Sequence, residues 1–160
     1  MRVLAVDPGT TESAWVLYDP EAHQAVSHGI QPNHDLRDRL SFTGRGSDIL
    51  AVEMVQSFGM PVGAEVFETV LWTGRFVEAW GGPWRTIYRK DVKLHLCQSL
   101  RAKDPNIRQA LLDRFPRTGG GKTPQVGTKA EPGPLYGFKS HLWSALAVAL
   151  TAAETKEDEC

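Results

Sequence analysis

The stretch MRVLAVDPGTT, residues 1–11, contains the first element of the predicted fold. Residues 2–7 form a short apolar run that stops at a Pro-Gly pair, and a second apolar run, residues 13–18, stops at an Asp-Pro pair. Apolar runs of this length that end at turn-forming residues are typical of β-strands. The two runs therefore predict an antiparallel hairpin, with Asp7 at the end of its first strand.

Further strands and helices are predicted along the rest of the chain. Strands are expected over residues 24–30, 49–55 and 84–88, and helices over residues 63–80, 91–99, 106–115 and 138–153. The order strand, long helix, strand indicates a parallel crossover. Residues 33–46 are polar and irregular, and residues 118–134, rich in Gly, Pro, Lys and Thr, predict a mobile loop that becomes ordered on a ligand. The pattern indicates an α/β domain with a mixed central sheet of about five strands flanked by helices.

The long helix over residues 63–80 carries two sets of apolar side chains. One stripe at helical spacing is expected to face the core and consists of Phe67, Val70, Leu71, Gly74 and Val77. The second set, Trp72, Phe76 and Trp80, lies off that stripe at a spacing of four. This second set could be buried between two subunits or could pack beneath the basic helices that follow.

The composition is that of a globular domain. Of 160 residues, 41% are apolar and 23% charged, which argues against a disordered or fibrous chain. We expect one domain over residues 1–155 and a charged tail over residues 156–160. The N-terminus does not read as a signal peptide, and no apolar run approaches the roughly 18 residues of a membrane span, so we expect a cytoplasmic protein without a membrane partner. Cys97 and Cys160 are expected to be a buried thiol and a tail thiol, because they match neither a disulfide framework nor a zinc site.

Charge is distributed unevenly along the chain. Residues 85–129 contain eleven Lys and Arg against three Asp, a net charge of +8, whereas the remainder carries −9. Such asymmetry within one domain predicts a basic face that binds a polyanion. A solvated helical face with local ion pairs is the alternative.

Three residues at the ends of predicted core elements are candidates for a reaction centre. Asp7 ends the first strand, Glu53 lies within a buried strand, and His141 lies in the first turn of the last helix. A buried carboxylate needs a partner, because an unpaired buried charge costs several kcal/mol. A metal ion shared with Asp7 would meet this need, and so would an ion pair with one of the arginines.

Five stretches of the sequence carry a resemblance to a known family: LAVDPGT (4–10), AVEMV (51–55), RKDVKLHLC (89–97), RAKDPNIRQALLDRF (101–115) and, most specific, GPLYGFKSHLWSALAVAL (133–150). Together they resemble the RuvC-like Holliday junction resolvases, particularly the small bacteriophage kind, of the RNase H-like superfamily. The resemblance covers nearly the whole chain. It implies an RNase H-like fold and a nuclease of DNA recombination and repair, located in the host cytoplasm if a bacteriophage encodes it.

The resemblance assigns roles to individual residues. Asp7 and Glu53 match the first two carboxylates of the family, and His141 falls where the family has an Asp or a His. Ser144, three residues further along the same helix, falls where classical RuvC proteins have another Asp. The site then holds two carboxylates instead of three or four, which bears on how tightly it holds a second ion. An imidazole ligand also suits Mn²⁺ better than Mg²⁺.

The activity that the resemblance implies is metal-dependent hydrolysis of phosphodiester bonds in a four-way junction. Two ions, Mg²⁺ or Mn²⁺, would activate water and stabilise the leaving 3′-oxygen. Asp7 would bridge the ions, and Glu53 and His141 would each hold one side, unless His141 instead orients or deprotonates the water. Paired symmetric nicks in branched DNA require two active sites, so a homodimer is implied.

Two groups of side chains are candidates for contacts with DNA. Phosphate contacts are predicted for Arg89, Lys90, Lys93, Arg101, Lys103, Arg108, Lys122, Lys129 and Lys139. Phe58 and Met60, in the loop after Glu53, match a region that reaches the junction centre in the family. They either wedge against unpaired bases or anchor the long helix in the core.

Other functions remain compatible with parts of the sequence. A module that binds branched DNA without cutting it is one alternative, because of Ser144, and an RNase H-like nuclease acting on RNA or on a hybrid is another. An ATP-binding protein of the actin and sugar-kinase group would need two domains and is disfavoured by the length of the chain. Residues 120–123, GGKT, do not form a phosphate-binding loop, because they follow a helix and lack the first glycine of that motif.

Overall fold

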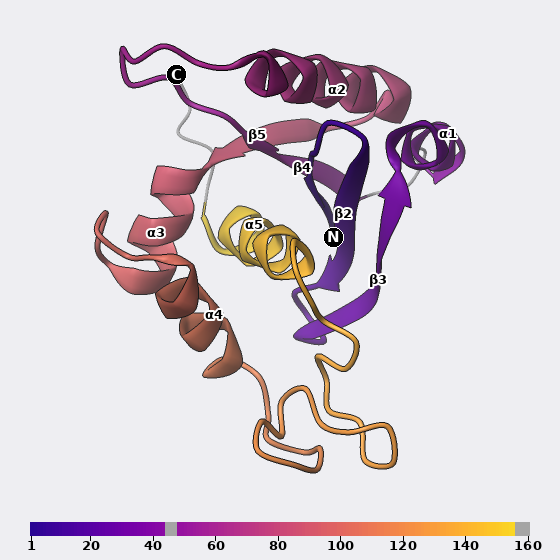
Figure 1. Ribbon diagram of the computed structural model, residues 1–160. Coiled ribbons are helices and arrows are strands. Elements are labelled where there is room, and N and C mark those ends of the chain that lie inside the picture. Colours follow the sequence, from indigo (N-terminus) through magenta and orange to yellow (C-terminus); the bar gives the residue numbers. More distant parts are fainter. Residues whose placement is uncertain (44–47, 156–160) are drawn as a thin grey trace.

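The computed structural model describes residues 1–43 and 48–155, which contain a five-stranded mixed sheet in the order β3-β2-β1-β4-β5 (Figure 1). The strands are β1 (Val3–Asp7), β2 (Glu12–Asp19), β3 (Gln24–Pro32), β4 (Ile49–Met54) and β5 (Trp84–Tyr88). The predicted class, a mixed sheet flanked by helices, is confirmed. The predicted charged tail with Cys160 lies outside the described residues.

The strand pairings follow the predicted connections. β2 pairs antiparallel with both β1 and β3, so the predicted hairpin is present and the strand predicted over residues 24–30 extends it to an antiparallel meander. β4 lies parallel to β1, and β5 lies parallel to β4. The long helix between β4 and β5 therefore makes the predicted parallel crossover.

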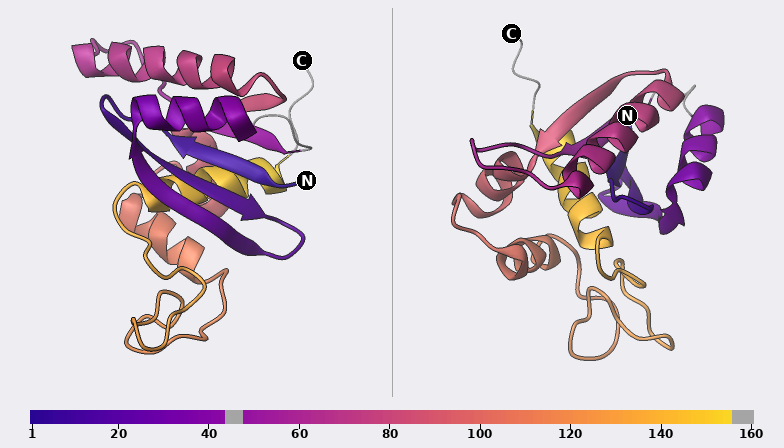
Figure 2. Two further views of the ribbon diagram at one scale, coloured as in Figure 1. Left: turned by 90° about the vertical axis from the view of Figure 1, so that its right-hand side faces the viewer. Right: turned by 45° about the horizontal axis from the view of Figure 1, so that its top comes forward.

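Helices cover both faces of the sheet (Figures 1 and 2). They are α1 (Asn33–Thr43), α2 (Ala64–Trp80), α3 (Arg89–Cys97), α4 (Asp104–Leu112) and α5 (Leu142–Glu154). Helices α1 and α2 lie on one face, and α5 lies on the other, with α3 and α4 beside it. Because successive residues of a strand point to opposite faces, Val3 and Ala5 pack on the α5 side, whereas Leu4 and Val6 pack toward α1 and α2.

Residues 33–43 form helix α1, so the prediction of an irregular segment over residues 33–46 is wrong for this part, while residues 44–46 lie outside the described residues. Leu36 and Leu40 are its two fully buried apolar residues, both 0% exposed. Their spacing of four places them on one side of the helix, against the sheet. Two apolar residues are too few to show a helical period in a largely polar stretch. The helix is therefore stabilised by its packing on the sheet and is not evident from the local sequence pattern.

The predicted orientation of the long helix, α2, is also wrong. Trp72, Phe76 and Trp80 are at most 9% exposed and pack against the sheet. Phe67 and Leu71, from the stripe expected in the core, are 65% and 61% exposed. Both sides of the helix are apolar, and the larger aromatic side is the one that the sheet covers. The aromatic set therefore makes neither of the two contacts predicted for it, a subunit interface or packing under the basic helices. It packs in the core together with α1.

Residues 118–134 fold into a compact loop and not into the mobile segment that the composition predicts. The backbone N–H of Gly133 donates to the carbonyl of Val126 (2.9 Å), and the buried side chain of Gln125 donates to the carbonyl of Leu112 (3.0 Å). A Cβ at Gly133 or Gly127 would lie 2.3 or 2.4 Å from backbone atoms of the same loop. These glycines therefore allow the backbone segments of the loop to pack closely. A high glycine content is expected both for such close packing and for a flexible loop, so composition alone does not separate the two.

Residues 1–43 and 48–155 also bear on the expectations for the Cys97 thiol and for membrane-spanning helices. Cys97 is half-buried and packs against the core on the α5 side. No helix in these ranges is long and apolar enough to cross a membrane.

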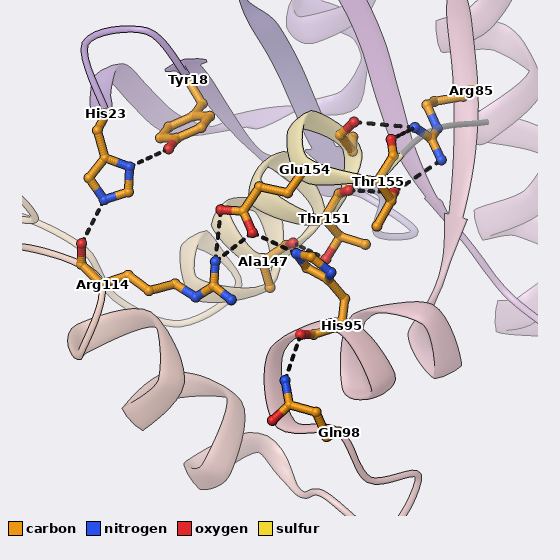
Figure 3. Close-up of polar contacts among 11 residues, drawn as sticks. Tyr18, His23, Arg85, His95, Gln98, Arg114, Ala147, Thr151, Glu154 and Thr155 are labelled. Atoms are coloured by element: carbon orange, nitrogen blue, oxygen red, sulfur yellow. Dashed lines mark hydrogen bonds and ion pairs between the residues drawn. The ribbon is translucent and has the colours of Figure 1, made fainter.

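A polar network ties the C-terminal end of α5 to neighbouring elements (Figure 3). Arg114 donates to both carboxylate oxygens of Glu154 (2.7 and 2.5 Å), and Nε2 of His95 lies 2.6 Å from the same carboxylate. Burial raises the pKa of Glu154, but the bonds from Arg114 and His95 outweigh it and hold this pKa below its ordinary value. Arg85 donates to the carbonyl oxygen of Thr155 (2.8 Å). The network thus fixes this end of α5 against α3 and the chain after α4.

Replacing Glu154 by Gln should lower the free energy of unfolding by about 1 kcal/mol at neutral pH, because charge-assisted hydrogen bonds are lost from a partly hydrated site. Folding lowers the pKa of Glu154, so its contribution is present above the ordinary Glu pKa and is lost as the pH falls through the folded value. Urea unfolding of both proteins over a pH series measures this difference. Glu12→Gln, at the exposed start of β2, is the control; an E154Q protein as stable as wild type at neutral pH would contradict the prediction.

Candidate active site

The sheet brings Asp7 and Glu53 together. Ala5 of β1 and Ala51 of β4 are paired neighbours on the face covered by α5. Asp7 and Glu53 stand two residues further along their strands, so strand alternation points both side chains to this same face. The parallel register therefore places two carboxyl groups side by side at the C-terminal ends of adjoining strands. The side chains of Asp7 and Glu53 are only 14% and 18% exposed.

Two buried polar residues that the sequence analysis does not single out hold the turn after Asp7. The side-chain amide of Asn33 donates to the carbonyl of Gly9 (2.9 Å), and the hydroxyl of Ser13 donates to Oδ1 of Asn33 (2.6 Å). A Cβ at Gly9 would lie 2.2 Å from the carbonyl oxygen of Glu12, so this position requires glycine. Ser13, a buried polar residue within an apolar strand, was the signal that could have revealed this support.

His141 contacts Asp7 from the start of α5. It immediately precedes the helix, and its Nδ1 lies 3.0 Å from Oδ2 of Asp7. Ser140 has a φ of 51°, and the helix begins only at Leu142, four residues later than predicted. The side chain of His141 is 75% exposed, so its ring contacts both the buried carboxyl group and solvent.

The carboxyl pair holds a proton more readily than ordinary carboxyl groups do. Burial raises the pKa of Asp7 to about 6, although the hydrogen bond with Glu53 and the charge of Arg89 oppose this shift. Burial, followed by repulsion from Asp7, raises the pKa of Glu53 to about 8. At neutral pH, the pair therefore retains a proton that two ordinary carboxyl groups would have released. Perturbed carboxyl groups in a cleft are typical of catalytic and metal-binding sites.

Arg89, the first residue of α3, connects this pair to a third carboxylate. One guanidinium nitrogen lies 3.9 Å from Oε1 of Glu53, and the other forms an ion pair with Asp104. The nitrogen facing Glu53 is buried and has no hydrogen-bond partner in the structure, so this contact is a loose ion pair. The ion-pair alternative for Glu53 is thus present but does not keep its pKa in the ordinary range. The structure places Arg89, predicted to contact DNA, within the site.

Two cavities share Arg89 as a wall. One, of about 240 Å³, opens on the carboxyl pair and includes Phe58 in its lining. The other, of about 460 Å³, lies between α4 and the start of α5 and is lined by Asp104, His141 and Ser144. Ser144 is therefore next to His141 at the edge of the site, as their spacing of three predicts. The candidate reacting groups face open space on both sides of Arg89.

The donor atoms at this site suit a divalent cation of the Mg²⁺ or Mn²⁺ type. Two carboxyl groups offer hard oxygen ligands, and His141 offers an imidazole nitrogen. Within residues 1–43 and 48–155, no three His, Cys, Asp or Glu side chains are already arranged to hold one metal ion. Asp7 nevertheless bonds to both other predicted ligands, Glu53 and His141. A cation would take over the charge balance that a proton and Arg89 now supply.

The basic segment divides between internal contacts and surface. Arg85 and Arg114 bind the C-terminal end of α5 (Figure 3), which agrees with the ion-pair alternative for part of the segment. The other predicted DNA contacts are exposed, apart from the half-buried Lys93; they are Lys90, Arg101, Lys103, Arg108, Lys122, Lys129 and Lys139. Arg108 lies over the ring of Trp143 (4.7 Å) and lines the larger of the two cavities. The remaining positive charge lies mainly on α3, α4 and the loop after them.

Replacing Glu53 by Gln should raise the free energy of unfolding in EDTA at pH 8 by about 1–3 kcal/mol. Folding raises the pKa of Glu53, so the stabilising effect of its protonated form is complete below the ordinary pKa and is lost as the pH rises through about 8. Wild type should therefore lose stability between acid and alkaline pH more steeply than E53Q does. Urea unfolding at pH 5 and pH 8 measures both slopes. Equal slopes would show that Glu53 does not carry the raised pKa.

The fold is similar to that of RuvC from Thermus thermophilus. The "Thermus thermophilus RuvC structure" matches with a TM-score of 0.68 and 20% sequence identity, over 96% of this chain and 93% of that chain. The structure of "T. thermophilus RuvC in complex with Holliday junction substrate" matches with a TM-score of 0.68 and 19% identity, over the same shares. No protein-family model and no curated protein matches the sequence significantly. The chain therefore has the RuvC fold, of the RNase H-like class that the sequence resemblance implies.

Proposed function

We propose that the protein is a structure-selective endonuclease that resolves four-way DNA junctions by divalent-metal-dependent hydrolysis. The observation that carries this proposal is the pair of buried, proton-sharing carboxyl groups of Asp7 and Glu53, with His141 bonded to Asp7. Carboxylates gathered in this way are suited to binding the cations that catalyse phosphodiester hydrolysis. The RuvC fold, seen in one solved structure with a Holliday junction, favours branched DNA as the substrate.

The three central residues have distinct tasks in this proposal. Asp7, Glu53 and His141 would hold Mg²⁺ or Mn²⁺, two ions in the fully loaded site, and the bound metal supplies activation of water and stabilisation of the leaving 3′-oxygen. Asp7 is central because it bonds to both of the others. Glu53 must release the shared proton before it binds a cation, so acid should weaken metal binding. His141, exposed at the cavity, either binds metal or moves a proton at the attacking water.

Contacts with DNA would come from two kinds of exposed side chain. Lysines and arginines of α3, α4 and the following loop would neutralise phosphates of the junction arms. Phe58 and Met60 are 76% and 74% exposed, so the alternative that they anchor α2 in the core is wrong. Phe58 also lines the cavity that opens on Asp7. An exposed aromatic side chain beside the carboxyl pair supports the proposed contact with unpaired bases.

Paired nicks require two active sites, and we include a homodimer in the proposal. Phe67 and Leu71 of α2 are more than half exposed on the side away from the sheet. Next to them, a groove of about 590 Å³ between α1 and α2 is lined by Val70, Leu71 and Gly74 among other residues. An exposed apolar helix face of this kind supports a subunit interface. The proposed interface is thus the face that the sequence pattern assigned to the core.

A module that binds junctions without cutting them is the second candidate. It is favoured by Ser144, which brings no carboxylate, and by the lack of a preformed three-ligand cluster in the described part of the chain. Cleavage assays separate the two candidates.

Wild-type protein should introduce paired symmetric nicks into a labelled four-way junction in Mn²⁺ or Mg²⁺, but not in EDTA. Asp7→Asn should bind the junction within about twofold of wild type while cutting about a thousandfold more slowly, a barrier increase of about 4 kcal/mol. Gel shifts and denaturing gels give both quantities. Asp113→Asn, an exposed carboxylate at the end of α4, is the matched control and should cut normally.

Each other outcome of this assay has its own meaning. Binding without cutting in every metal would leave the binding module. Cutting of an RNA–DNA hybrid in preference to the junction would indicate another RNase H-like nuclease. Normal cutting by Asp7→Asn would show that the assigned reaction centre is wrong.

Replacing Leu71 by Glu should convert a dimer into a monomer, because two charges would be buried in an apolar interface. Sedimentation velocity of the two proteins at equal concentration measures the change. Leu100→Glu is the control, since Leu100 is similarly exposed (58% against 61%) but lies between α3 and α4. A monomeric wild type, or a dimeric Leu71→Glu variant, would refute this interface.

A further inference from the structure

The cavity beside Ser144 receives a carboxylate from a different helix. Ser144, at the position where the RuvC resemblance leads us to expect an Asp, lines the cavity of about 460 Å³ together with His141 and Arg89. Asp104, the first residue of α4, lines the same cavity. We propose that Asp104 supplies the carboxylate that α5 lacks and joins Asp7 and Glu53 in holding the divalent cation. This inference rests on the proposed function and names a further ligand of the same site.

Arg89 shows how close Asp104 is to the carboxyl pair. One of its terminal nitrogens pairs with Asp104, and another lies 3.9 Å from Glu53. The two carboxyl groups are thus joined through a single guanidinium group. If Arg89 withdraws, a divalent cation between them can contact both. Arginine is well suited to a new partner at this place, because the guanidinium group also binds phosphates of DNA.

Asp104 is free to change partners at little cost. Its side chain is 84% exposed, and an ion pair between exposed groups contributes only about 0–1 kcal/mol to stability. Its carboxylate pairs with the same guanidinium group that faces Glu53. A cation held by Asp7, Glu53 and Asp104 would offset the repulsion among three carboxylates. Asp104 is therefore exposed enough to change partners, and a single guanidinium group separates it from Glu53.

Ser144 complements this arrangement. A serine side chain is small and neutral, and it stands in the wall that α5 presents to Asp104 across the cavity. An Asp at position 144 would add a further negative charge to a cavity that already contains Asp104. In this proposal α4, and not α5, supplies the further carboxylate to the cavity that Asp104 and Ser144 share.

A first-turn Asp also interacts favourably with the positive end of its own helix, so a purely structural role for Asp104 is the competing explanation. Binding of Mn²⁺ alone, measured by calorimetry and by electron paramagnetic resonance without DNA, separates the two. Asp104→Asn should weaken Mn²⁺ binding by about tenfold or more, whereas Asp113→Asn, at the other end of α4, should leave it unchanged. Ser144→Asp in the Asp104→Asn background should restore binding to within about threefold of wild type. Circular dichroism verifies that each variant is folded.

Arg89 provides the control for an indirect effect. If Asp104 acted only by holding Arg89 away from Glu53, the double variant Arg89→Gln/Asp104→Asn would regain wild-type Mn²⁺ binding, and the inference would be overturned. Wild-type Mn²⁺ binding by Asp104→Asn, or no recovery with Ser144→Asp, would overturn it as well. If wild type does not cut junctions but Mn²⁺ binding follows the expected pattern, the proposed function fails while Asp104 remains a ligand. If wild type cuts junctions and Asp104→Asn binds Mn²⁺ normally, only the role of Asp104 fails.

Discussion

The repulsion between two buried carboxyl groups, those of Asp7 and Glu53, is the constraint on which the rest of the site depends. Parallel pairing of β1 with β4 ends both strands at one edge, and strand alternation turns both side chains toward α5. Two like charges in such a place cannot both stay ionised without a compensating cation. In this structure a shared proton and the loosely placed Arg89 meet that need.

Rigid supports surround this unstable pair. Asn33 and Ser13 hold the turn after Asp7 through Gly9, and His141 bonds to Asp7 from the start of α5. Helix α5 is in turn held at its far end by the network of Glu154 with α3 and the chain after α4 (Figure 3). The position of His141 therefore depends on contacts at both ends of one buried helix. A strained pair of charges within a well-supported frame is the arrangement expected where stability is exchanged for function.

The two faces of the sheet present different surfaces. Helices α1 and α2 offer the apolar groove that we propose as a subunit interface, whereas α3, α4, the segment between them and the compact loop carry most of the exposed positive charge of the described residues. The carboxyl pair lies on the α5 side, at the C-terminal ends of β1 and β4. If two copies associate through α2, as we propose, this separation would leave the basic surface free for DNA.

The sequence by itself determined the strands, the parallel crossover and the place of Asp7 at a strand end, because apolar runs and turn residues are local signals. It also brought forward Glu53, since a carboxylate in an apolar run requires a partner. Only the tertiary structure decided which side of α2 is buried, because both sides are apolar and docking on the sheet selects the aromatic one. It alone showed that the glycine-rich loop is packed, and it placed Arg89 and Asp104 beside Glu53. Those contacts join residues far apart in the chain, and they form only when the sheet and the helices pack together, so a local sequence pattern does not predict them.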